Sequence, residues 1–433
     1  MCYIYSASSQ FYKLMNQAKI QFWYKTVTYL LLSLTEGLNT SMVAPFFPIR
    51  AELLHKTSKT FIGFCMASSE LGGLLTNISL LYFCKNIRKT KIPLVTSGCL
   101  AAITFGGFGV CDRIENKVLY QVSQVGFRFL CGSSASLIWG LGVKFLINDD
   151  FSEQLTAKLM TGVFTTYFLG ISSGPFIGGL IYQFFGYDAI FVLLCIVEII
   201  VSLSLCFTES ESRKLDGSHL KPATSNKCIF KLMFSFSFMQ LCASQLTIFS
   251  IVAFNEVTFA LLLSSRFHML QKNIVYVFSF GTALSLVGSS LALYINGRCW
   301  FRKSITCVIL LQFFATTFIF FSQYESTYSL ALAVFGFLII IFAHSLLCGA
   351  FALSYRVLIN AILGKGYDDV AKISSSVMRS TFTVAARFLG NFLLAGVLND
   401  ILGYYIVIAG FPIVLSFLLA VEFITIFFTK EYF

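Results

Sequence analysis

Ionisable side chains stand at several points inside the long apolar runs of this chain. In a hydrocarbon environment, burial disfavours the charged form of a carboxylate, whereas a nearby arginine favours it again. A carboxylate held between these two influences can take up and release a proton, which is what a reversible proton site needs. The carboxylates inside the apolar runs are Glu36, Glu70, Glu198, Glu256 and Glu422, and Arg128 is a buried arginine.

Two of these carboxylates have polar neighbours in the sequence. Glu36, Asn39 and Thr40 are spaced i, i+3 and i+4, which places the three side chains on one face of a helix. Glu256 follows Asn255 in an apolar run of the second half of the chain. We therefore single out these residues as groups able to face a buried pathway.

The composition places these groups in a membrane. Hydrophobic residues make up 57% of the 433 positions, and charged residues only 12%. A water-soluble domain of this length does not need so much apolar surface, so the chain is predicted to be an integral multi-pass membrane protein. The N-terminal segment has no short apolar core with a small-residue cleavage site, so we expect the first apolar helix to direct insertion.

Apolar runs long enough to cross a bilayer recur along the chain, and they predict an all-α membrane protein with twelve transmembrane helices. The connections are short except for one polar segment near the middle. The predicted spans are 27–48, 61–83, 92–111, 120–148, 157–183, 188–207, 236–264, 273–295, 304–322, 328–355, 374–398 and 404–428.

A weak internal repeat divides these spans into two halves. Gly179–Tyr187 resembles Gly396–Tyr404 at an offset of 217 residues, about half the chain. Glu52–Lys56 precedes the second span as Arg266–Leu270 precedes the eighth. Parallel halves of this kind place their substrate path at the interface between them. The predicted parts are a cytosolic N-terminal segment 1–26, a six-helix bundle 27–207, a cytosolic linker 208–231 and a second six-helix bundle 232–433.

The net charge of +11 reports topology rather than nucleic-acid binding. With the N-terminus in the cytosol, most lysines and arginines fall in cytosolic loops, so both termini are predicted to be cytosolic. The thirteen cysteines show no pair at zinc or redox spacing. We therefore expect no metal and no cofactor. No G-x-x-x-x-G-K-[ST] phosphate loop and no catalytic triad stand out, which argues against ATP hydrolysis and against an enzyme.

A glycine-rich stretch carries the most specific motif. Its residues match, position by position, the G-x-x-x-G-P-x-x-G-G antiporter motif of the fifth helix in the major facilitator superfamily, which the chain thus resembles. The resemblance implies a bend and a close-packing face that seals one side of the pathway; helix packing alone is the alternative. The motif residues are Gly170, Gly174, Pro175, Gly178 and Gly179.

Further segments resemble the same superfamily. Arg128 to Ser136, with Gly132, is similar to its R-x-x-q-G-x-g-a-a motif in the fourth helix. The run from Asn39 to Pro45 and Pro48 resembles the first helix of the drug:proton antiporter branch, particularly vesicular amine and polyamine transporter-like proteins. Asp112-Arg113 fits the same branch.

The resemblance implies two pseudo-symmetric six-helix bundles whose first and seventh helices line a central cavity. Glu36 and Glu256 are then the proton-carrier candidates, and Arg128 faces the cavity to couple proton and substrate. Glu198 and Glu422 lie in the sixth and twelfth helices, which usually face outward, so neither is expected in the pathway.

Two departures from the family pattern leave the substrate open. The loop after the second span keeps only the basic part of its motif, without the aspartate or glycines. Vesicular monoamine carriers hold an aspartate in the eleventh helix where this chain has Thr381 to Ala386, flanked by Arg379 and Arg387. An organic cation or polyamine is the substrate that the resemblance suggests, whereas the missing aspartate favours an anionic or zwitterionic one.

We therefore predict a monomeric secondary transporter that moves a small organic solute across a vesicular, organelle or plasma membrane. It would work by alternating access, in exchange for protons, with the proton gradient as its energy source. The alternatives are a non-transporting membrane receptor of the same fold and a proton-independent uniporter.

Overall fold

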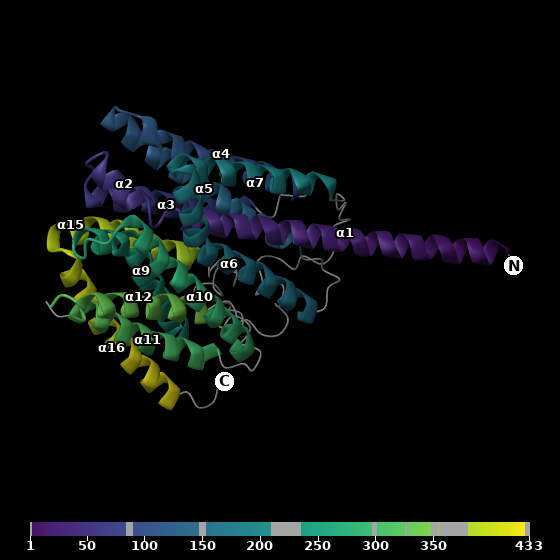
Figure 1. Ribbon diagram of the computed structural model, residues 1–433. Helices are drawn as coiled ribbons and strands as arrows, with labels where there is room; N and C mark the ends of the chain where they lie inside the picture. The colour runs from purple at the N-terminus through teal and green to yellow at the C-terminus, as the bar shows by residue number, and fades with distance from the viewer. Residues whose placement is uncertain are drawn as a thin grey trace.

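The computed structural model describes residues 2–83, 90–146, 153–208, 235–296, 301–324, 327–347, 354 and 380–428. All regular elements in this part of the chain are helices, and they form an upper and a lower group in Figure 1. The first group contains α1 (Cys2–Ser41), α2 (Phe47–Leu53), α3 (Lys59–Phe83), α4 (Lys91–Val110), α5 (Lys117–Leu146), α6 (Glu153–Phe185) and α7 (Tyr187–Ser204). The second contains α9 (Phe236–Ser265), α10 (Gln271–Asn296), α11 (Phe301–Phe321), α12 (Ser329–Leu346), the π-helix η5 (Leu389–Leu398), α15 (Asn399–Leu402) and α16 (Tyr404–Phe428).

The predicted spans correspond to these helices. Ten helical segments of the described chain are long and apolar enough to cross a membrane. The remaining two long helices, α1 and α5, carry Glu36 and Arg128 and are less apolar. The predicted linker 208–231 lies, apart from Thr208, outside the described residues, as does the start of the eleventh span, 374–379.

The ends of the first helix differ from the prediction. The span was expected to end at Pro48, but α1 ends at Ser41 and a turn leads into the short helix α2. Pro45 lies in this turn and Pro48 in the first turn of α2, because proline has no backbone N–H for a helix interior. At its other end α1 begins at Cys2, so residues 2–26 belong to the same helix, which projects from the bundle in Figure 1.

Each group packs as a bundle, and the two bundles meet along two pairs of helices. In the first bundle α1 packs on α6, α3 on α5 and α4 on both α5 and α7. In the second, α11 packs on α12 and α16, and α10 packs on α12. Between the bundles, α6 contacts α10 and α3 contacts η5. This arrangement confirms the predicted twin-bundle fold.

The internal repeat is visible in the backbone at two corners. Gly186 and Gly403, which precede α7 and α16, have φ angles of 84° and 82°. Lys56 and His268 also match, with positive φ angles of 48° and 50° that non-glycine residues seldom adopt. Corners as specific as these, at equivalent places in both halves, confirm that the bundles are pseudo-symmetric.

Candidate functional site: a polar cavity between the bundles

A cavity of about 130 Å³ lies where the bundles meet. Its wall comes from α1, α3, α5 and α6 of the first bundle and from the helix 380–402 of the second. The chain thus surrounds a buried space with carboxylates, arginines, hydroxyls and two aromatic rings. The lining residues are Glu36, Asn39, Thr40, Met66, Ser69, Glu70, Gly73, Arg128, Cys131, Gly132, Ala135, Ser136, Trp139, Tyr167, Ser380, Thr383, Val384, Arg387 and Asn391.

Glu36 and Glu198 form a buried carboxyl pair beside this cavity. Their side chains are 2% and 0% exposed, and a hydrogen bond joins them. Asn39 Nδ2 donates a further hydrogen bond of 2.5 Å to Glu198 Oε2. A hydrogen bond between two carboxyl groups requires a proton on one of them, and two like charges this close would repel strongly. The pair can therefore hold one proton between α1 and α7.

The expectation that Glu198 and Glu422 face outward is wrong. Glu198 is fully buried, and Glu422 is only 4% exposed. The buried stripe of α7 runs through Leu194, Glu198 and Ser202, at the spacing of one helical face. A carboxylate four residues before a serine in an otherwise apolar helix is the signal that would have revealed this inward face.

Arg128 lines the cavity, as the sequence led us to expect, and it is 4% exposed. One terminal nitrogen donates to Met66 Sδ at 3.3 Å, and the guanidinium carbon lies 4.8 Å from the centre of the Phe108 ring. Its Nε has no hydrogen-bond partner. Arg128 therefore presents a poorly satisfied positive charge to the cavity.

Arg387 joins the two bundles through two carboxylates. Its Nε donates to Glu70 Oε1 at 2.8 Å across the interface, and its terminal nitrogens donate to both oxygens of Glu256 at 3.2 and 2.7 Å. The sequence had shown Glu70 and Arg387 inside apolar runs but had given neither of them a role in the pathway. No local pattern could pair Arg387 with a residue 317 positions away. The signal available was the arginine itself, which is costly in a membrane helix without a partner.

Asn255 and Glu256 occupy different surroundings from Glu36 and Asn39. Glu256 is engaged by Arg387, and Asn255 is not among the lining residues. The Asn255 side chain donates to the Ile251 carbonyl at 2.8 Å and accepts from the Tyr404 hydroxyl at 3.2 Å. The structure thus places Asn255 in the packing of the second bundle.

The glycine motif lies on the faces of α6 that meet α1 and α10. A Cβ added to Gly170 would lie 2.9 Å from the Cα of Gly37 in α1, and one added to Gly178 would lie 3.3 Å from the Phe46 ring. Gly174 lies against Ser41 and Met42, and Gly179 against Val275. Small residues at these positions let the helices approach closely. The helix α6 continues through Pro175, so the bend expected there stays a prediction.

Gly132 has the same role in α5. A Cβ at this position would lie 2.8 Å from the Cα of Ser69 in α3. The motif of the fourth helix therefore brings α5 and α3 together beside the cavity, with Arg128 one helical turn away.

On the side of the molecule that carries α2, the bundles touch directly; we call this the α2 side. Thr60 Oγ1 donates to Asp400 Oδ2 at 2.6 Å. A Cβ on Gly63 would lie 2.6 Å from the Cα of Gly396. Gln271 Nε2 donates to the Pro45 carbonyl at 2.7 Å. These contacts close the cavity toward the α2 side.

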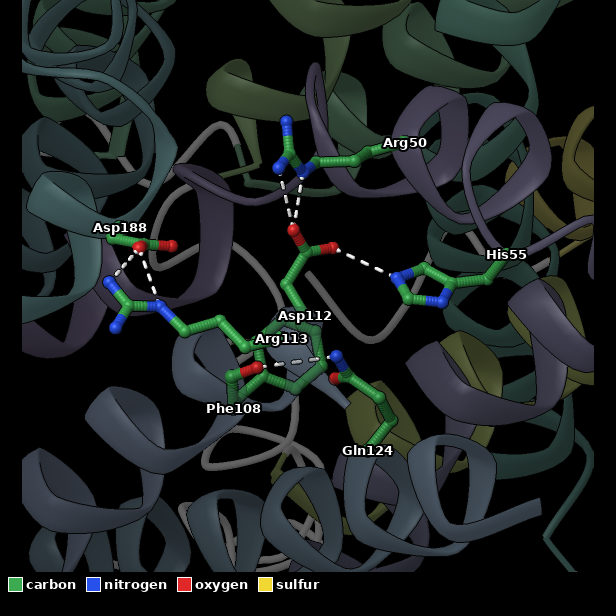
Figure 2. Close-up of polar contacts among 7 residues, drawn as sticks. All are labelled: Arg50, His55, Phe108, Asp112, Arg113, Gln124 and Asp188. Carbon is green, nitrogen blue, oxygen red and sulfur yellow. Dashed lines mark hydrogen bonds and ion pairs between the residues drawn. The ribbon is translucent and has the colours of Figure 1, made fainter. Parts of the chain in front are cut away.

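Asp112 holds α2 to the first bundle, as Figure 2 shows. Arg50 Nε donates to Asp112 Oδ2 at 2.7 Å, and His55 Nε2 lies 3.2 Å from Oδ1. The neighbouring Arg113 pairs with Asp188 at the start of α7. The Asp112-Arg113 run thus fixes three elements at the α2 side. In the described part of the chain, no group of three or more His, Cys, Asp or Glu side chains could hold a metal ion.

Comparisons with known proteins agree with this architecture. The Major Facilitator Superfamily pattern matches residues 29–354. The MFS-type transporter SLC18B1 of Rattus norvegicus is 27% identical over 179 residues, and that of Homo sapiens 27% identical over 174. These matches cover 39% and 38% of this chain, and 37% and 36% of the relatives. The match therefore spans little more than a third of those proteins.

A solved structure shares the fold. The nucleoside transporter NupG superposes on 92% of this chain and 99% of its own, with a TM-score of 0.65 and 12% identity. A point mutant of NupG gives a TM-score of 0.67 with 13% identity, over 92% of this chain and all of that one. At this identity the likeness concerns the fold alone.

Proposed function

This chain belongs to the major facilitator superfamily, and we propose that it is a membrane transporter that exchanges a small organic solute for protons by alternating access. The observation that carries the proposal is the cavity lined by polar and charged side chains between two pseudo-symmetric bundles, with the buried Glu36–Glu198 carboxyl pair at its edge. Binding at the interface of repeated halves is the arrangement expected of a rocking carrier.

The Glu36–Glu198 pair is the proposed proton site. When the shared proton leaves, two adjacent buried carboxylates repel each other, and the Asn39 hydrogen bond to Glu198 cannot neutralise either of them. Loss of the shared proton therefore favours separation of the two carboxylates or binding of a cation from the cavity. Protonation and the packing of α1 against α7 are coupled through this contact.

The Arg387–Glu70 ion pair is the proposed link between proton binding and bundle movement. It joins α3 of the first bundle to the helix 380–402 of the second. Rocking the bundles shifts these helices against each other, so the pair must stretch or exchange. Glu256 keeps Arg387 neutralised while that happens, since both of its oxygens accept from the guanidinium. We therefore assign Glu256 to the support of Arg387 rather than to proton transfer.

The direction of transport follows from the proposed topology. With both termini in the cytosol, the α2 side faces the lumen of an organelle or the cell exterior. The α2-side contacts then hold the cavity closed toward that compartment. Protons that flow from that compartment into the cytosol would drive the solute in the opposite direction, into the compartment. The proposed working unit is a monomer, the proton gradient is its energy source, and it needs no cofactor.

Reconstitution into proteoliposomes tests this function. An imposed pH gradient should drive uptake of a transported solute, and a protonophore that collapses the gradient should stop it. Uptake that is intact but indifferent to the gradient would identify a uniporter instead. Specific binding with no movement of any solute in a broad panel would identify a receptor of the same fold.

A further inference from the structure

Arg128 and Arg387 are the two arginines that are almost fully buried in the described chain, but they are neutralised differently. Arg387 has two carboxylate partners. Arg128 makes no ion pair with any described residue, and its contacts are the Met66 sulfur and the face of the Phe108 ring. One buried cation is thus fully compensated, and the other is left open toward the cavity.

These contacts do not offset the burial of the Arg128 charge. An arginine over a phenylalanine ring gains a modest attraction. Removing an ion from water costs considerably more, even after the protein relaxes. A permanently charged guanidinium cannot lose its proton to escape this cost. An anion that enters the cavity would compensate the buried positive charge of Arg128.

Open hydrogen-bond acceptors lie at another part of the same cavity. Among the described residues, Glu36 Oε1 and Asn39 Oδ1 have no hydrogen-bond partner. The Glu36–Glu198 pair keeps one negative charge when it shares one proton, and no described lysine or arginine forms an ion pair with either carboxylate. This part of the cavity therefore suits a cationic donor with several N–H groups.

We propose that the cavity binds a small zwitterionic amino carboxylate. Its carboxylate pairs with Arg128, and its ammonium group donates to Glu36 and Asn39. The inference rests on the proposed function, because it names the solute of the same site. Arg128, Glu36 and Asn39 line the same cavity of about 130 Å³, so a short molecule can reach both charges. A polyamine satisfies the acidic part but meets repulsion from Arg128.

Binding to the purified full chain in nanodiscs tests this inference without requiring transport. The probes are glycine, β-alanine and γ-aminobutyrate, with propylamine and propionate as matched molecules that carry one charge each. At least one amino carboxylate should bind about thirtyfold or more tightly than both single-charge probes, since each of those leaves one buried charge unpaired. Equal affinity for propylamine and β-alanine would overturn the proposal.

The variant Arg128→Gln assigns the carboxylate contact. It should lose most of its affinity for the amino carboxylate, about thirtyfold, and bind propylamine at least as tightly as wild type does, because a repelling positive charge is gone. Arg128→Lys should retain part of the affinity because it keeps the charge without the planar fork. Unchanged amino-carboxylate affinity in Arg128→Gln would contradict the assignment. If either variant fails to fold, the comparison of amino carboxylates with propylamine and propionate on the wild-type protein still tests the proposal.

A chloride titration separates the solute from an inorganic counter-ion. Stabilisation by chloride over gluconate, with no effect of any amino carboxylate, would show that Arg128 holds an inorganic anion and would overturn the proposal. Failure of the proposed function is a different result. In that case amino carboxylates bind in nanodiscs, but a pH gradient drives no uptake into proteoliposomes.

Discussion

The two bundles share their backbone corners but not their chemistry. Gly186 and Gly403 turn the chain in the same way, yet the cavity wall draws on four helices of the first bundle and on one of the second. The first bundle supplies the carboxyl pair and an arginine with no counter-ion among the described residues, and the second supplies an arginine clamped by two carboxylates. The duplicated framework thus positions an asymmetric site. Its charged groups without an ion-pair partner among the described residues, Arg128 and the Glu36–Glu198 pair, belong to the first bundle.

The largest expected effect comes from the clamped arginine. Arg387→Met removes the only described partner of two carboxylates whose side chains are 14% and 19% exposed, so the free energy of unfolding should fall by about 3–5 kcal/mol. Thermal unfolding of detergent-purified protein, without added solute, measures it. Arg128→Met is the matched control in the other bundle. It removes a buried cation that has no counter-ion, so stability should stay constant or rise; equal losses in both variants would contradict the contrast.

The carboxyl pair should control coupling rather than folding. Glu198→Gln removes one partner of the shared proton at a residue that does not line the cavity, so pH-gradient-driven uptake should drop to background while solute exchange without a gradient persists. Glu36→Gln should also lose gradient-driven uptake, together with part of its affinity for the solute. Glu422→Gln replaces another buried glutamate, one that does not line the cavity, and should keep gradient-driven uptake. Gradient-driven uptake that survives in Glu36→Gln and Glu198→Gln would remove the pair from the mechanism.

The shared corners should respond alike in both halves. Gly186→Ala and Gly403→Ala force a Cβ onto backbones with φ near 80°, at a cost of about 1–3 kcal/mol each. Neither position has a heavy atom within 4 Å of the added Cβ, so backbone strain alone should set the loss. Gly126→Ala, also in open space but helical, is the control and should not destabilise. A large difference between the two corner variants would weaken the symmetry argument.

The smallest effect is expected at the surface of the α2 side. Asp188→Asn breaks an exposed ion pair with Arg113 and should change stability by at most about 1 kcal/mol. Asp112→Asn should cost more, about 1–2 kcal/mol, because Asp112 is nearly buried and serves both Arg50 and His55. Thermal unfolding of the two variants side by side checks the order, and a larger loss in Asp188→Asn would reverse it.

The sequence predicted the framework because lipid imposes strong local rules. Span length, glycine spacing and the repeated glycine–tyrosine pairs at 186–187 and 403–404 can each be read from a few neighbouring residues, and they predicted the twin bundles. The places of Glu198 and Glu422 were mispredicted: α7 and α16 are mostly exposed, as the family resemblance implied, but these two glutamates lie on their buried faces. The buried stripe that includes Glu198 argued against the outward placement.

Partners across the bundles could not be predicted in the same way. Arg387 contacts Glu70 and Glu256 because helices distant in sequence pack together. The sequence alone indicates only that each of these charged residues lies in an apolar segment, where charges are rare. Asn255 shows the converse. Its position beside Glu256 suggested a cavity residue, but a hydrogen bond with Tyr404 accounts for it within the second bundle.

Locking the α2 side tests the central claim, that the bundles must part there for transport, most directly. Thr60 and Asp400 contact each other across the bundles, so the double variant Thr60→Cys/Asp400→Cys should form a disulfide on mild oxidation. Each single variant, oxidised in parallel, controls for the native cysteines. The account predicts that oxidation stops uptake in the double variant alone and that reduction restores it. Uptake at the unlocked rate through a fully cross-linked protein would contradict alternating access.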